Sequence, residues 1–141
     1  MSTASAGRVT ITLGYAGLIP FLLPAVLVSA GSAHAGIASM IAQSYALAIL
    51  CFLCGSWWGM AQRSAVSATL LLSNAYLLLA LAIYLFANDW WALAAALLLA
   101  GAWLCEQSRL LFPDFPQAYR RMRAILTLIA GASMVTIYLN S

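Results

Sequence analysis

Five long apolar stretches restrict what this 141-residue chain can fold into. A helix crosses the ~30 Å hydrocarbon core of a bilayer in about 20 residues. No segment alternates polar and apolar residues as the strands of a membrane barrel do. We therefore predict an all-α polytopic membrane helix bundle, forming one transmembrane domain over residues 1–141. Its five transmembrane helices are expected at about 9–29, 36–61, 65–87, 90–111 and 122–139.

The charge content supports a membrane location. Only 6% of the residues are charged and 65% are hydrophobic, whereas an average soluble domain carries about 25% charged residues. So few charges cannot cover the surface of a water-soluble fold. The expected partner is the lipid bilayer, with another membrane protein as a further possibility. Nucleic acid is not expected, because the few basic residues are spread along the chain.

The arginines predict an orientation. With five spans, every arginine falls on one side of the membrane, while His34, Asn88 and Asp89 fall on the other. Arginine is enriched in cytoplasmic loops, so we expect a cytoplasmic N-terminus and an outside C-terminus. Trp90 and Trp91 are then expected to anchor the outer interface. The arginines are Arg8, Arg63, Arg109, Arg120, Arg121 and Arg123.

The first span has one competing interpretation. The Ala-His-Ala segment at 33–35 resembles a signal-peptidase site, but the apolar stretch before it is longer than usual and contains Pro20 and Pro24. We therefore expect a retained span. The two prolines lie on one face and leave carbonyls without helical partners. They indicate either a bend that helps packing, which we prefer, or a kinked helix lining a small cavity.

The second span carries a G-x-x-x-G pair, Gly55 and Gly59. Two glycines on one face allow another helix to approach closely. Packing inside the bundle and contact with a partner are both compatible with this pattern. We interpret the neighbouring Trp57 and Trp58 as interfacial aromatics.

The cysteines do not predict a metal site. Cys51 and Cys54 form an isolated C-x-x-C within an apolar helix, and Cys105 is the one further thiol, whereas structural zinc takes four ligands. We expect all three cysteines to be buried small hydrophobic residues. His34 has no second histidine to join it, so we expect no metal and no cofactor.

Two polar residues fall within predicted spans. Asn74 lies near mid-membrane and should face the bundle, as a structural hydrogen-bonding group or in a polar patch of a ligand cavity. Glu106 lies near the inner end of the fourth span. We expect it to pair with Arg109 or Arg63 as a structural anchor, with a proton or substrate site as the alternative.

The segment from Phe112 to Arg123 breaks the fourth span and begins the fifth. Its two prolines stop one helix and permit the next to start. Basic residues in and beside this segment can meet anionic lipid headgroups or a protein partner. The predicted lipid or partner surface comprises Arg109, Tyr119, Arg120, Arg121 and Arg123.

Three blocks of the sequence resemble a known family. The blocks are LGYAGLIPF at 13–21, YALAILCFLCGSWWG at 45–59 and PQAYRRMRAILT at 116–127. Together they resemble the small inner-membrane proteins of domain of unknown function 3429. The resemblance implies a bacterial inner membrane and a multi-span helical fold, and implies no activity. One departure is Trp57, which stands where the family is expected to carry histidine. The matching residues are Tyr15, Pro20, Trp58, Gly59, Tyr119 and Arg123.

Three hypotheses for function follow. The first is a non-enzymatic accessory or assembly factor that binds another membrane protein. The second is a binder or carrier of a small amphiphile, a lipid or quinone, in a cavity in the inner half of the bundle. Candidate ligand-binding residues for that cavity are Tyr15, Pro20, Trp58, Asn74 and Glu106.

The third hypothesis is a membrane enzyme with a shallow site at Glu106 and Arg109. It requires a further catalytic group, for which Arg63, Gln62 and Tyr119 are the candidates. It has the weakest basis, because the sequence offers neither a hydrolase triad nor paired deep carboxylates.

Overall fold

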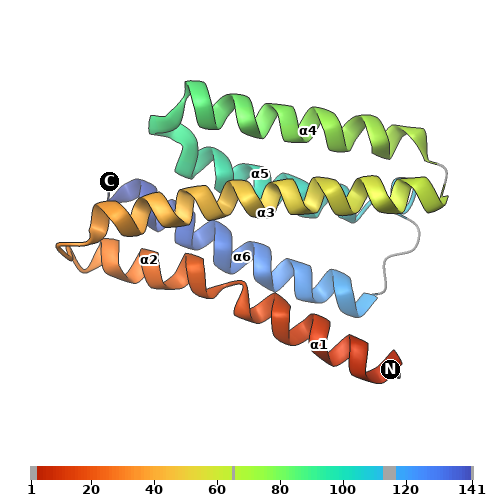
Figure 1. Ribbon diagram of the computed structural model, residues 1–141, viewed down its shortest axis with the longest axis horizontal. Helices are drawn as coiled ribbons and strands as arrows, with labels where there is room; N and C mark the ends of the chain where they lie inside the picture. Colours follow the sequence, from red (N-terminus) through yellow and green to blue (C-terminus); the bar gives the residue numbers. More distant parts are fainter. Residues whose placement is uncertain (1–2, 65, 113–116, 141) are drawn as a thin grey trace.

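A computed structural model describes residues 3–64, 66–112 and 117–140, and the regular structure within these ranges is helical (Figure 1). Five of its segments are long and apolar enough to cross a membrane, which confirms the five predicted spans. The helices are α1 (Thr3–Ala16), α2 (Ile19–Ser29), α3 (Ala35–Ser64), α4 (Ser67–Phe86), the short 3₁₀ helix η1 (Asn88–Trp90), α5 (Trp91–Glu106) and α6 (Gln117–Leu139).

The first span is built from two helices rather than one continuous helix. Pro20 has no backbone N–H to donate to the carbonyl of Ala16, the last residue of α1. The chain turns at Gly17 and Leu18, where Leu18 N donates to Tyr15 O at 3.0 Å. Pro20 then occupies the first turn of α2, where its fixed φ is compatible with a helix. The predicted bend is thus a complete break between α1 and α2.

The boundary between the last two spans also differs from the prediction. Helix α5 ends at Glu106, five residues before the predicted end, and the chain continues in turns through Phe112. Helix α6 begins at Gln117, earlier than predicted, because its polar first turn continues regularly into the apolar part. Residues 113–116, which include both prolines of this segment, lie outside the described residues.

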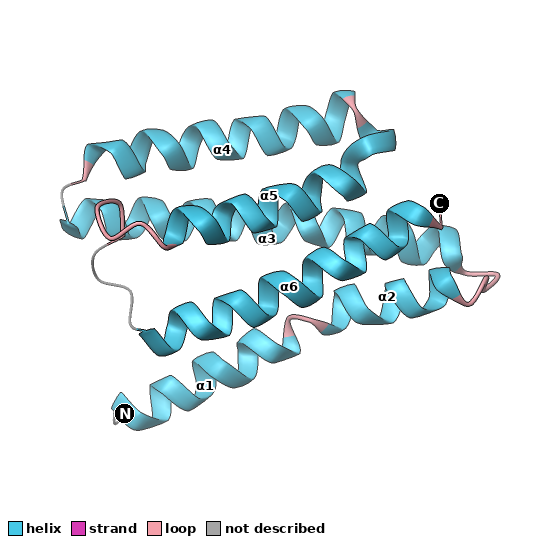
Figure 2. Ribbon diagram, turned by 180° about the vertical axis from the view of Figure 1, so that it is seen from behind, coloured by secondary structure: helices cyan, strands magenta, loops and turns pink. Residues whose placement is uncertain are grey.

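The helices pack side by side in a bundle. Helix α3 lies between α2 and α4, and α6 packs against α5 and α2 (Figures 1 and 2). Helix α1 contacts α6, with Gly14 lying against Met122 and Leu126. Helix α4 is peripheral: of its side chains only Thr69, Ser73 and Ala80 are buried. The core of the bundle therefore lies among α2, α3, α5 and α6.

The connections between the helices lie at two opposite ends of the bundle. The N-terminus and the α3–α4 and α5–α6 connections lie at one end, and the α2–α3 turn, η1 and the C-terminus lie at the other (Figure 1). All six arginines belong to elements or connections of the first end. The fold therefore brings the basic residues together at one end of the molecule.

Candidate functional site

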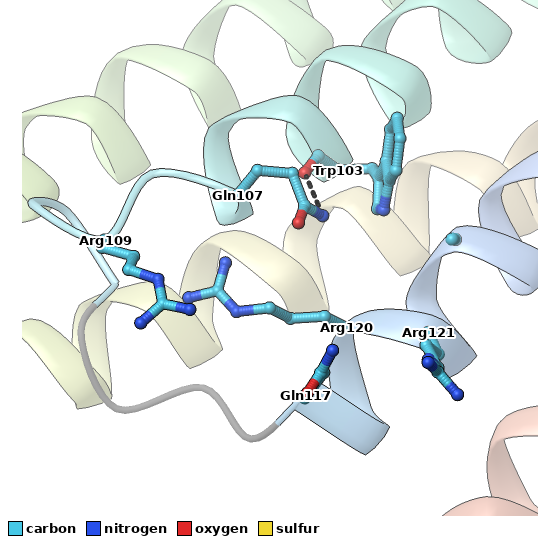
Figure 3. Close-up of a pocket in the computed structure, with 7 residues that line it drawn as sticks. Trp103, Gln107, Arg109, Gln117, Arg120 and Arg121 are labelled. Carbon is cyan, nitrogen blue, oxygen red and sulfur yellow. Dashed lines mark hydrogen bonds between the residues drawn. The ribbon is translucent and has the colours of Figure 1, made fainter.

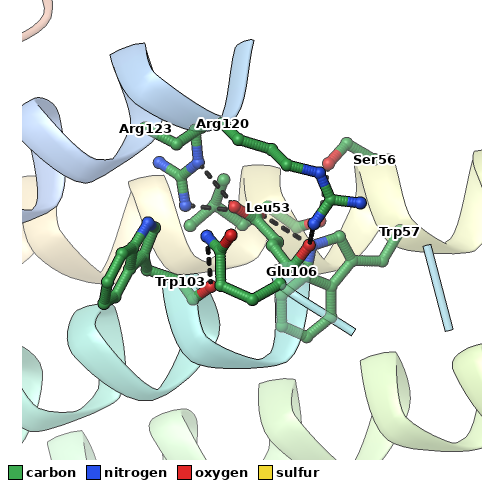
Figure 4. Close-up of polar contacts among 8 residues, drawn as sticks. Leu53, Ser56, Trp57, Trp103, Glu106, Arg120 and Arg123 are labelled. Atoms are coloured by element: carbon green, nitrogen blue, oxygen red, sulfur yellow. Dashed lines mark hydrogen bonds and ion pairs between the residues drawn. The ribbon is translucent and has the colours of Figure 1, made fainter. Parts of the chain in front are cut away.

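Glu106, the last residue of α5, is the central group of the site. Its side chain is only 2% exposed. Arg123 of α6 donates from Nε to Oε2 at 2.9 Å and from Nη2 to Oε1 at 3.3 Å. Trp57 of α3 donates from Nε1 to Oε1 at 3.0 Å (Figure 4). Three helices therefore meet at one carboxylate.

This arrangement explains how a carboxylate can be buried here. Transferring an ionised group out of water is costly unless it is paired and hydrogen-bonded. Arg123 is itself buried and forms an ion pair with Glu106. The pair differs from the sequence prediction of Arg109 or Arg63 as partner: both of those arginines are exposed. The pairing also removes the Glu106–Arg109 arrangement on which the enzyme hypothesis was based.

The two adjacent tryptophans have opposite environments. Trp57 is fully buried, and its ring packs against Phe112 at 5.2 Å and Tyr76 at 5.6 Å between centroids. Trp58 is 48% exposed on the outer face of α3. The prediction of two interfacial aromatics is therefore wrong for Trp57, whose indole N–H needs a polar partner inside the bundle and finds Glu106.

Arg120 connects the end of α5 to α6. Its Nη1 donates to the carbonyl of Glu106, and its Nη2 donates to the carbonyl of Phe112 at 2.8 Å. The last carbonyls of a helix have no partners within that helix and carry partial negative charge. Arg120 thus caps α5 while Arg123, one turn later, neutralises its last side chain.

An apolar cavity of about 410 Å³ lies beside the ion pair, enclosed by α1, α2, α3, α5 and α6. Most of its lining is aliphatic or aromatic, with Arg123 and Thr127 among the polar exceptions. Two lining residues, Leu13 and Phe52, are largely exposed, so the cavity opens to the outer surface of the bundle.

The cavity contains polar groups that can receive a ligand. Thr127 is 7% exposed, and its Oγ1 has no hydrogen-bond partner among the described residues. Arg123 uses Nε and Nη2 for Glu106, which leaves Nη1 without a hydrogen bond in the same part of the chain. Buried polar atoms in proteins are usually satisfied. The cavity therefore offers hydrogen-bonding capacity next to a wide apolar surface.

None of the predicted ligand-binding residues, Glu106 included, is among the residues that line this cavity. Asn74 is exposed and donates to Leu70 O of its own helix at 2.9 Å, so the expectation that it faces the bundle is wrong. An intrahelical bond to the carbonyl four residues earlier satisfies the amide without a neighbouring helix. Tyr15 is exposed and Pro20 is half-buried, and the residues that line the cavity do not include them or Trp58.

Small residues on α3 face outward. A Cβ added at Gly55 or Gly59 would meet no atom within 4 Å, so the described bundle does not use them for internal packing.

The three cysteines differ in burial. Cys54 is buried, Cys105 is half-buried and Cys51 is exposed, which corrects the expectation that all three are buried. Within the described ranges, no group of three or more His, Cys, Asp or Glu side chains is placed to hold a metal ion.

The two tryptophans that were expected to anchor the outer interface, Trp90 and Trp91, also differ in their burial. Trp90 is exposed and can lie at an interface. Trp91 is fully buried, and its Nε1 donates to the carbonyl of Gln43 at 3.0 Å. Tyr84 packs edge-on against it at 5.2 Å. Trp91 thus joins α3, α4 and α5 instead of anchoring the bundle to the interface.

Sequence reasoning missed Arg123 and Thr127 as interior residues, although a signal was present. The buried positions of α6 continue from Arg123 at intervals of three or four residues. This spacing marks one face of a helix, so a helical projection of 122–139 would have placed the arginine on the apolar face. The buried series is Arg123, Thr127, Ala130, Met134 and Ile137.

The fold and the site define a multi-pass membrane protein: a five-span helical bundle with a buried ion pair beside an apolar cavity. The chain belongs to the family described as protein of unknown function (DUF3429), whose sequence profile matches residues 6–139. It is also similar to transmembrane protein 69 of Xenopus tropicalis, with 32% identity over 96% of this chain. The chain spans 56% of the length of that relative. No solved structure matches it.

Proposed function

We propose that this protein binds a small amphiphile, a lipid or quinone, in the cavity between α1, α2, α3, α5 and α6. The observation that carries the proposal is the unpartnered Thr127 hydroxyl inside an apolar cavity that Arg123 also lines. A ligand with an oxygen-bearing head could accept hydrogen bonds from both side chains. Its apolar part would contact the aliphatic walls.

The dimensions and access of the cavity support this proposal. Ligand sites are mostly apolar concavities of about 300–1,000 Å³ with a few polar groups that fix orientation. The volume of about 410 Å³ falls in that range. Because Leu13 and Phe52 lie at the surface, a lipophile could enter laterally from the bilayer. We propose binding rather than catalysis, since both oxygens of Glu106 are occupied by Arg123 and Trp57.

Native mass spectrometry of protein released from native-lipid nanodiscs would test the proposal. The wild-type protein should retain one small lipophile. Ala130→Leu should release it, because Ala130 lines the cavity and three added carbons would fill part of the space. Thr127→Val should weaken retention by about tenfold, the effect of losing one hydrogen bond of about 1.4 kcal/mol.

Ala48→Leu is the matched control, since Ala48 is exposed on α3 and does not line the cavity. It should retain the ligand like the wild type. Equal retention by wild type, Ala48→Leu and Ala130→Leu would show that the adducts are annular lipids and would refute the proposal.

A second candidate is the accessory role, in which α3 binds a helix of another membrane protein. The open face around Gly55 and Gly59 favours it, because small residues permit close approach of helices. Crosslinking in membranes from a position beside Gly55 should then capture a defined partner. Gly55→Leu should abolish that product by steric blockage.

The proposed location is a bacterial inner membrane, with the arginine-bearing end cytoplasmic. The three sequence blocks that resemble the family support the first part. The collection of all six arginines at one end of the bundle supports the second part.

A further inference from the structure

A second, basic cleft lies at the arginine-bearing end of the bundle. Its volume is about 570 Å³, and it separates the end of α5 from the first turns of α6 (Figure 3). None of its lining residues also lines the apolar cavity. Those that matter to the argument are Trp103, Gln107, Arg109, Gln117, Arg120 and Arg121.

Two of the arginines that line this cleft have no counter-ion within the described part of the chain. Arg109 and Arg121 are exposed and have no carboxylate partner there. Glu106, the nearby acid, is bound to Arg123. The guanidinium groups of Arg109 and Arg120 are turned toward one another although they come from different elements (Figure 3). An anion bound in the cleft would lie near these guanidinium groups and reduce their mutual repulsion.

Neutral donors surround these charges. Gln107 and Gln117 line the cleft, and the Nε2 of Gln107 also donates to the carbonyl of Trp103 at 3.4 Å (Figure 3). The Nε1 of Trp103 is buried and has no hydrogen-bond partner within the described residues. Arg120 is held in place by the carbonyls of Glu106 and Phe112. Donors fixed in this way lose little conformational freedom when an anion binds.

We propose that this cleft binds a phosphate group, and that the group belongs to the headgroup of an anionic phospholipid. Guanidinium groups recognise phosphate oxygens through paired N–H donors. The cleft lies where α5 ends and α6 begins, the depth of a headgroup for helices that cross the bilayer. Helix α6 also directs its N-terminal N–H groups toward this end, which favours an anion. This site is independent of the amphiphile cavity.

Native mass spectrometry of the purified full chain in detergent would test the site with defined probes. Phosphatidylglycerol and phosphatidylcholine with identical acyl chains would be added in equal amounts, and inorganic phosphate would be added in a separate titration. The wild-type protein should retain one phosphatidylglycerol in preference to phosphatidylcholine. Arg109→Gln and Arg121→Gln should each reduce that preference by about fivefold, since each arginine near the surface contributes about 1 kcal/mol.

Arg63→Gln is the control, because Arg63 is an exposed arginine of α3 that does not line the cleft. It should leave the preference unchanged. If inorganic phosphate binds and is lost in the Arg109 and Arg121 variants, without preference between lipids, the phosphate site stands and its natural ligand is soluble. If no probe binds, or if Arg63→Gln has the same effect as the cleft variants, the proposal is refuted.

Discussion

Glu106 and Arg123 show how a membrane bundle can keep a charged pair in its interior. Each partner alone would carry a large desolvation penalty, and the pair offsets it through two hydrogen bonds from Arg123 and one from Trp57. The contribution of such a pair to net stability is small, whereas the cost of removing one member is large. The pair thus acts chiefly to specify how α3, α5 and α6 meet.

Glu106→Gln should destabilise the protein strongly. The amide would leave the Arg123 charge buried without a counter-ion, at a cost of about 3–5 kcal/mol. The free energy of unfolding, measured in mixed micelles of mild detergent and SDS, would report this loss. The double variant Glu106→Gln/Arg123→Met should recover much of it, because the uncompensated charge is gone. Equal stability of single and double variants would contradict the assignment of a buried ion pair.

Trp57→Phe should lower the free energy of unfolding by about 1.5–3 kcal/mol, the range for a hydrogen bond to a charged group. Trp58→Phe is the matched control, since Trp58 is exposed and makes no hydrogen bond among the described residues. That variant should unfold like the wild type in the same mixed micelles. A larger effect at Trp58 than at Trp57 would overturn the placement of the two rings.

The sequence identifies Glu106 as an unusual residue, but it does not identify Arg123 as its ion-pair partner. Glu106 is the one acid inside a predicted span, and an intramembrane acid indicates a special environment. Arg109 was expected as partner because it is three residues away on the same helix. The structure ends α5 at Glu106, so Arg109 leaves the helix face and Arg123 arrives from α6. That meeting depends on how two helices pack, which local spacing does not determine.

At the scale of the helices, some glycines face a neighbouring helix and others face open space. Gly101 of α5 lies against Tyr76 of α4: an added Cβ would lie 2.7 Å from the tyrosine oxygen. That hydroxyl donates to the carbonyl of Leu98. Gly101 therefore permits the contact between α4 and α5, which is the least extensive contact between spans that follow one another in the chain. Gly55 and Gly59 of α3 have open space instead.

Gly101→Ala should destabilise the bundle by about 1–3 kcal/mol, because the methyl group must displace the Tyr76 hydroxyl from its hydrogen bond. Gly55→Ala should be neutral or stabilise by up to about 1 kcal/mol through improved helix propensity. Thermal unfolding in detergent compares the two variants directly. A destabilised Gly55→Ala protein would indicate that another helix packs on that face, as the accessory role requires.

The five spans were easier to predict from the sequence than the break within the first span or the cavity beside it. Predominantly apolar stretches of about 20 residues were enough to predict the five spans. The break in the first span was only partly predictable, since Pro20 removes one hydrogen bond and a helix can either bend or end at such a position. The cavity could not be predicted, because its lining comes from five helices, α1, α2, α3, α5 and α6, and local residue spacing does not determine how they pack.

At the scale of the whole molecule, the odd number of spans places the termini at opposite ends, and the arginines gather at the end of the N-terminus (Figure 1). The apolar cavity and the basic cleft flank the same first turns of α6, from Tyr119 to Arg121. A membrane ligand and an anionic headgroup would therefore bind on the same side of the bilayer. Which side that is depends on the orientation of the bundle.

The positive-inside rule predicts that the arginine-bearing end is cytoplasmic. Single cysteines introduced at His34 and Gln62, in a background with Cys51, Cys54 and Cys105 replaced by alanine, test this directly. Both positions are exposed: His34 directly precedes α3, and Gln62 lies in the last turn of that helix. A membrane-impermeant maleimide applied to intact cells should label His34→Cys, while Gln62→Cys should react only after the membrane is opened. The reverse pattern would place both proposed sites on the outer side, and labelling of both positions in intact cells would indicate two orientations. Because Gln62→Cys leaves every arginine in place, the outcome reports the native charge distribution.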